Sequence, residues 1–224
     1  MTPMSRREEA LYLTQSTGVL PAIKLKHSGD LLPIAEAMVA GGIRVLEVTM
    51  TTPGVLDAFR AIKAALGNQL ILASGTTLSA PAAYDAIQAG AGIIVSPAVV
   101  PEVIAVAHTY QVACYVGAFT ATEVLTAMKA GASMVKIFPA SLAGPRYMTN
   151  LKMVYPDVSL IPSGGISLET AGEFIRCGAS AISGARNFYD EGEVAQHGMA
   201  WVTQQAERYL AIVAEARETA YPLP

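Results

Sequence analysis

Residues 133–139 (SMVKIFP) hold a single lysine, Lys136, in an otherwise apolar run between Gly131 and Pro139. Such a run is typical of a short buried strand. Removal from water favours the neutral form of an amine, and a neutral amine is a nucleophile that condenses with carbonyl groups. Lys136 is therefore a candidate Schiff-base nucleophile. The structural alternative is a lysine at a strand end whose ammonium group reaches solvent.

A second isolated charge, Glu47, lies among apolar neighbours in residues 45–49 (VLEVT). A carboxylate in apolar surroundings is suited to moving protons. The structural alternative is a buried ion pair with Lys136 and nothing more. Because unpaired burial of charge is costly, two isolated charges at the ends of separate strands favour catalysis.

The elements that must position these residues alternate along the whole chain. Strands are predicted at residues 19–25, 44–50, 70–76, 92–97, 113–119, 134–139, 159–163 and 181–185. Helices are predicted at 8–14, 30–40, 53–66, 80–89, 101–109, 121–130, 145–154, 168–177 and 194–217. Eight strand and helix units, about 20 to 28 residues apart, predict an α/β protein with a closed (β/α)8 TIM barrel.

We expect a single domain over residues 1–224. It has an N-terminal helical lead-in at 1–14, a barrel core at 19–190, a final helix at 194–217 and a frayed tail at 219–224.

The composition of the chain excludes several classes of protein. The 224 residues are 52% hydrophobic and 15% charged, which favours a large core over disorder. A formal charge of -3 argues against nucleic acid as a partner, and no apolar run is long enough for a membrane span. With no secretory signal visible, we expect a cytoplasmic protein. The three histidines are scattered, so no metal site is expected, and no other cofactor is predicted.

In barrels of this type the reactive groups collect at the carboxyl ends of the strands. Small, backbone-exposing turns follow the seventh and eighth predicted strands, a common place for phosphate binding. These turns contain Ser163, Gly164, Gly165, Ser183, Gly184, Ala185 and Arg186.

Five motifs, in this order, resemble the bacterial 2-keto-3-deoxy-6-phosphogluconate (KDPG) aldolase and 4-hydroxy-2-oxoglutarate aldolase family over residues 15 to about 190. They are residues 40–49 (AGGIRVLEVT), 75–76 (GT), 95–97 (VSP), 135–140 (VKIFPA) and 162–166 (PSGGI).

The resemblance implies a metal-free class I aldolase of carbohydrate metabolism (the Entner-Doudoroff pathway) that acts on a small keto acid as a homotrimer. It also implies that Lys136 is the Schiff-base lysine and Glu47 the general acid and base. Thr76, Pro97 and Phe138 would shape the pyruvate pocket, and Ser163 would contact the substrate.

Three positions depart from the family pattern. Thr51 stands where many members have the arginine that binds the substrate carboxylate, so Lys24 or Lys26 at the end of the first strand is the expected replacement. By position, Lys26 lies at the mouth and Lys24 risks pointing into the packed barrel. The family's usual Gly-Ala-Gly-Thr is Ala73-Ser74-Gly75-Thr76 here, a change that is expected to crowd or polarise the pocket floor. Ala185 replaces a phosphate-contacting serine, and Arg186 would compensate.

The predicted function is cleavage of KDPG, or of a close relative, to pyruvate and glyceraldehyde 3-phosphate by an aldehyde-lyase. One alternative is the same chemistry on 4-hydroxy-2-oxoglutarate or another unphosphorylated keto acid. Another is a phosphosugar isomerase in which Lys136 is only electrostatic. A non-enzymatic alternative is a barrel that binds a phosphorylated metabolite or a partner chain without turnover.

Overall fold

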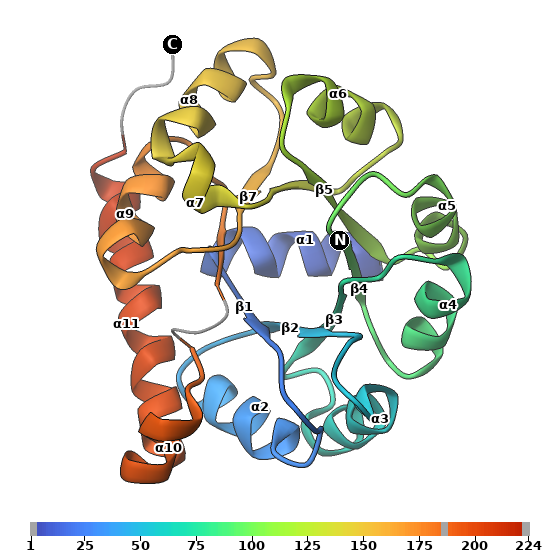
Figure 1. Ribbon diagram of the computed structural model, residues 1–224, viewed down its shortest axis with the longest axis vertical. Helices are drawn as coiled ribbons and strands as arrows, with labels where there is room; N and C mark the ends of the chain where they lie inside the picture. Colours follow the sequence, from blue (N-terminus) through green and yellow to red (C-terminus); the bar gives the residue numbers. More distant parts are fainter. Residues whose placement is uncertain (1–3, 185–187, 221–224) are drawn as a thin grey trace.

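The computed structural model describes residues 4–184 and 188–220, in which eight parallel strands form a nearly closed barrel surrounded by helices (Figure 1). The strands are β1 (Val19–Ile23), β2 (Val45–Thr49), β3 (Ile71–Gly75), β4 (Ile93–Ser96), β5 (Ala113–Ala118), β6 (Met134–Ile137), β7 (Leu160–Pro162) and β8 (Ile182–Gly184). The helices are α1 (Arg6–Thr17), α2 (Leu31–Ala40), α3 (Val55–Leu66), α4 (Ala80–Gln88), α5 (Pro101–Thr109), α6 (Ala121–Lys129), α7 (Ala140–Ala143), α8 (Pro145–Val154), α9 (Leu168–Arg176), α10 (Glu191–His197) and α11 (Met199–Glu218).

The order of neighbouring strands is β7-β6-β5-β4-β3-β2-β1-β8, so strands that follow one another in the sequence lie side by side. One isolated parallel bridge between Ser163 and Ser183 joins the two ends of the sheet. The predicted (β/α)8 barrel is confirmed.

The strands carry two apolar faces because successive side chains point to opposite sides. One face fills the inside of the barrel with small and large residues, among them Leu20, Ala73, Tyr115 and Ile161. The other face packs against the surrounding helices in a larger core. Every strand is therefore buried on both sides, as its apolar sequence predicts.

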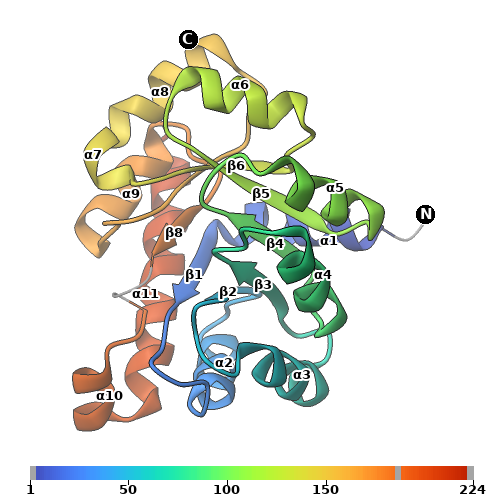
Figure 2. The same ribbon diagram turned by 45° about the vertical axis from the view of Figure 1, so that its right-hand side comes forward.

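Helix α1 lies across the amino-terminal end of the barrel and runs behind the strands in both views (Figures 1 and 2). It begins at a capping box between Ser5 and Glu8. Its Thr14 hydroxyl lies 2.6 Å from the hydroxyl of Tyr115, inside the barrel. The helix thus closes this end and leaves the opposite end, where the strands finish, for a site.

Several predicted boundaries differ from the structure. The predicted final helix is wrong as one piece: it is divided into α10 and α11 at Gly198, whose φ of 68° lies in the left-handed region. The lead-in helix extends to Thr17, beyond the predicted residue 14. The short helix α7 was not predicted. Of the predicted frayed tail, residues 221–224 lie outside the described residues.

Among the described helices, none combines the length and the apolar character that a membrane span requires.

Candidate active site

A cavity of about 480 Å³ opens where the strands end, away from α1. Its walls come from β1, β2 and β6 and from the segments that follow β1, β3, β4, β6 and β7. The predicted site residues that line it are Lys24, Glu47, Thr76, Pro97, Lys136, Phe138, Ser163, Gly164 and Gly165. Residues predicted from separate parts of the sequence therefore meet in one place.

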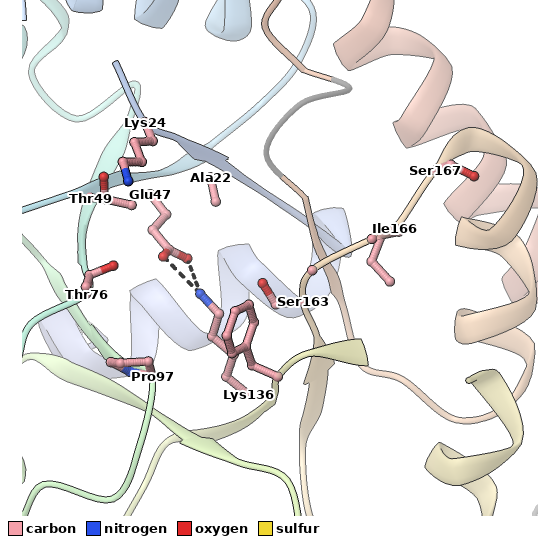
Figure 3. A pocket seen from close by; sticks show the side chains of 13 residues that line it. Ala22, Lys24, Glu47, Thr49, Thr76, Pro97, Lys136, Ser163, Ile166 and Ser167 are labelled. Carbon is pink, nitrogen blue, oxygen red and sulfur yellow. Dashed lines mark hydrogen bonds and ion pairs between the residues drawn. The ribbon is translucent and has the colours of Figure 1, made fainter. Parts of the chain in front are cut away.

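At the centre of the cavity Lys136 and Glu47 form an ion pair (Figure 3). The Nζ atom of Lys136 donates to Oε1 of Glu47 at 2.9 Å and to Oε2 at 3.0 Å. The two side chains are only 9% and 2% exposed. A carboxylate at this distance can take a proton from the amine, which leaves a nucleophile, and can return it to a reacting group.

Two glycines give this constellation its space. A Cβ atom at Gly75 would lie 2.8 Å from Cγ of Glu47 and would overlap its Oε1. A Cβ atom at Gly117, the register partner of Lys136, would overlap the carbonyl group of Pro97. A side chain at either position would displace a wall residue, so both glycines are needed for the observed geometry.

Thr76 follows β3 directly and lines the cavity with a backbone φ of 56°, a region uncommon for residues other than glycine. Ser74, two residues earlier, is fully buried, and its hydroxyl lies 2.8 Å from that of Thr77. Because Ala73 faces the barrel interior, Ser74 faces the opposite side of the strand. Ser74 therefore does not polarise the pocket floor, and that part of the expectation is wrong.

The candidate carboxylate-binding residues lie in different places. Lys24, directly after β1, lines the cavity rim and is exposed there, not packed inside the barrel. Lys26 does not line the cavity; its Nζ lies 3.3 Å from Oε2 of Glu191, and these side chains are 83% and 60% exposed. Thr51 is also outside the lining, with its hydroxyl 3.1 Å from that of Thr49.

The predicted phosphate turn after β7 forms the other side of the cavity. Gly164 and Gly165 have φ values of 85° and 79°, which glycine adopts at little cost. The turn leads to Ser167, the N-cap of α9, where the helix dipole favours an anion, although the amide of Ser167 itself donates to the Thr170 hydroxyl at 3.0 Å. The amide of Gly165 donates to no other residue in the described ranges. This turn can hold an anionic group.

The turn after β8 contributes less to the cavity. Ser183 is fully buried and accepts a hydrogen bond from the Ser163 hydroxyl at 3.4 Å. Neither Ser183 nor Gly184 lines the cavity. Ala185 and Arg186 lie outside the described residues.

Within the described ranges, four residues that line the cavity were not predicted as site residues: Ala22, Thr49, Ile166 and Ser167. The alternation of side chains along a strand could have predicted Ala22 and Thr49, because each lies two residues from another residue that lines the cavity. The start of α9 carries a signal for Ser167, since serine is a preferred N-cap.

A sequence profile described as "KDPG and KHG aldolase" matches residues 12–205. The 2-dehydro-3-deoxy-phosphogluconate aldolase of Treponema pallidum (strain Nichols) is 34% identical over 202 residues, which cover 87% of this chain and 93% of that protein. The 2-dehydro-3-deoxy-6-phosphogalactonate aldolase of Escherichia coli (strain K12) is 31% identical over 201 residues, or 89% of this chain and 92% of that protein.

Among solved structures, a KDPG aldolase from Legionella pneumophila has pyruvate captured at low pH as a covalent carbinolamine intermediate. It superposes with a TM-score of 0.79 at 27% identity and covers 88% of this chain and 96% of its own. The profile spans most of the chain, the barrel is shared, and the cavity holds the motif residues. The chain belongs to the KDPG and KHG aldolase family and is an aldehyde-lyase.

Proposed function

We propose that this aldolase, which cleaves substrates of the KDPG type, does so through a Schiff base on Lys136. The observation that carries the proposal is the buried ion pair of Lys136 and Glu47 inside the cavity. The carbinolamine of the Legionella relative supports it, because a carbinolamine is the adduct of an amine and a ketone.

The reaction begins when the neutral amine of Lys136 attacks the C2 ketone to give a carbinolamine. Loss of water gives an iminium ion. The C4 hydroxyl then loses its proton, the C3–C4 bond breaks, and its electron pair moves to the iminium nitrogen. Glyceraldehyde 3-phosphate leaves, and an enamine of pyruvate remains. Protonation at C3 and addition of water release pyruvate and regenerate the amine.

Glu47 is the proposed proton carrier, directly or through a water molecule. Its carboxylate lies 2.9 Å from Lys136 Nζ, so it can take a proton from the ammonium group before the amine attacks the ketone. The carboxyl group can give that proton to the departing hydroxyl of the carbinolamine, and the carboxylate so regenerated can accept the C4 hydroxyl proton and deliver it to C3. Thr76, Pro97 and Phe138 line the cavity around the pair and shape the space for the three-carbon product.

The phosphoryl group is proposed to bind at the turn of Gly164 and Gly165 and the start of α9. We therefore expect the unphosphorylated keto acid to be cleaved with a kcat/KM about 100-fold lower or worse, because remote binding energy positions the reacting carbonyl. Steady-state kinetics on KDPG and on 2-keto-3-deoxygluconate measure this ratio.

A matched pair of variants locates the effect. Gly165→Ala and Gly198→Ala introduce the same change at two glycines of positive φ, but only Gly165 lines the cavity. Gly165→Ala should remove the preference for the phosphorylated substrate, and Gly198→Ala should keep it. Equal kcat/KM for both substrates in the unaltered enzyme would instead favour cleavage of 4-hydroxy-2-oxoglutarate.

The proposal also includes a homotrimer, which rests on the family resemblance, and a cytoplasmic location, which rests on the interpretation of the sequence.

A further inference from the structure

Lys24 is a cation in the reaction cavity that has no partner among the described residues. Of the residues that the structure describes, three charged side chains line the cavity, and two of them, Lys136 and Glu47, neutralise each other. Lys24 forms no ion pair or side-chain hydrogen bond with any residue in the described ranges, and it is exposed at the rim. Among the described residues of the lining, Lys24 is therefore the one charge that no neighbouring side chain compensates.

The strand geometry explains why Lys24 reaches the cavity. Leu20 and Ala22 face the barrel interior, and Lys24 continues the same alternation one step beyond the end of β1. Lys26 shares this parity, but the chain has left the strand by then and its ammonium is paired with Glu191 outside the cavity. The alternation of side chains therefore does not show which of the two lysines reaches the cavity, whereas the position at which β1 ends does.

Lys24 and the phosphate turn lie on opposite sides of the reacting amine. In Figure 3, Lys24, Thr49 and Thr76 lie on one side of the Lys136–Glu47 pair. Ile166 and Ser167 lie on the other side. The cavity thus has two ends that favour anions, a lysine at β1 and a helix amino terminus at α9, with the nucleophile between them.

We infer that Lys24 binds the substrate carboxylate and that the keto acid lies across the cavity from β1 to α9. This inference rests on the proposed function, whose substrate carries a carboxylate on one side of the reacting ketone and a phosphoryl group on the other. Because the carboxyl carbon is bonded directly to the ketone carbon that Lys136 attacks, the carboxylate must meet its cation close to the pair. Lys24 supplies that charge, and the phosphoryl group points to the turn of Gly164 and Gly165.

The test compares Lys24→Met, Lys24→Arg and Lys26→Met with the unaltered enzyme. Calorimetry measures the affinity for pyruvate and for pyruvamide, the same ketone with an uncharged amide. Inhibition of cleavage measures the affinity for glyceraldehyde 3-phosphate. Lys24→Met should weaken pyruvate binding by about 10- to 100-fold, the usual scale for loss of a hydrogen bond to a charged group.

The other binding measurements show whether the effect of Lys24→Met is specific to the carboxylate. Lys24→Met should leave binding of pyruvamide and of glyceraldehyde 3-phosphate within about twofold of the unaltered enzyme, and Lys24→Arg should recover much of the pyruvate affinity. Lys26→Met should bind pyruvate normally. Unchanged pyruvate affinity in Lys24→Met overturns the inference, and so does a loss that affects pyruvamide equally.

A loss confined to glyceraldehyde 3-phosphate also overturns it, because Lys24 then serves the phosphate end. Calorimetry detects pyruvate whether or not an imine forms. Failure of this inference is therefore separate from failure of the Schiff base, which borohydride trapping on Lys136 reports.

Discussion

Lys136→Ala is expected to lose cleavage activity by about 10⁴-fold or more, the scale on which loss of a covalent nucleophile is felt in other enzymes. Solvent cannot replace an amine that forms a bond to the substrate. The initial rate of pyruvate release from KDPG, at saturating substrate, measures the loss. The binding of glyceraldehyde 3-phosphate should survive, because its proposed contacts lie at the turn of Gly164 and Gly165.

The alanine variant also leaves Glu47 buried without a counter-ion, which costs about 3–5 kcal/mol of unfolding free energy. Lys136→Arg keeps the positive charge and cannot form the imine, so it separates covalent catalysis from electrostatics. We expect it to fold, as judged by circular dichroism and thermal unfolding, and to be as inactive as the alanine variant. A folded arginine variant with a sizeable share of the original kcat would show that Lys136 acts through its charge alone, as an isomerase or a binding protein would use it.

Glu47→Gln should lower kcat by about 10²–10⁴-fold, the usual contribution of a positioned general acid or base. The amide keeps the size of the side chain and its place beside Lys136, but it cannot carry a proton. KM should change much less than kcat, because the lost interaction belongs to the proton-transfer steps. Steady-state kinetics on KDPG give both constants.

Glu102→Gln, an exposed change on α5, is the matched control and should have the original kcat. The loss of charge at Glu47 leaves the Lys136 ammonium unpaired, so the thermal stability of the folded variant must be measured beside its kinetics. Equal kcat in Glu47→Gln and the unaltered enzyme would reduce Glu47 to a buried counter-ion.

The barrel was predictable because its signals are local. Each strand is a short apolar run, each helix follows at a regular interval, and the carboxyl ends of parallel strands must share one end of the barrel. That rule alone brings Glu47 of β2 and Lys136 of β6 together, although 89 residues separate them. The distance between their charged atoms and the degree of burial required the three-dimensional structure.

Other features could not be predicted from the periodicity of the sequence. Lys24 and Lys26 have the same parity, so only the observed end of β1 at Ile23 places one in the cavity and the other outside it. Ser74 belongs to a strand buried on both faces, where an apolar run does not reveal which side faces the barrel. Gly198 divides the final helical segment at a residue that helices also tolerate, at a cost of about 1 kcal/mol.

Borohydride trapping reports whether Lys136 forms a covalent imine with a keto acid. The enzyme is incubated with pyruvate and sodium borohydride, digested, and mapped by mass spectrometry, with Lys136→Arg as the control. We expect irreversible inactivation that requires pyruvate, and one reduced pyruvate adduct on the peptide that contains Lys136. Activity that survives trapping with no adduct on Lys136, or an adduct on another lysine, would contradict the proposed imine on Lys136.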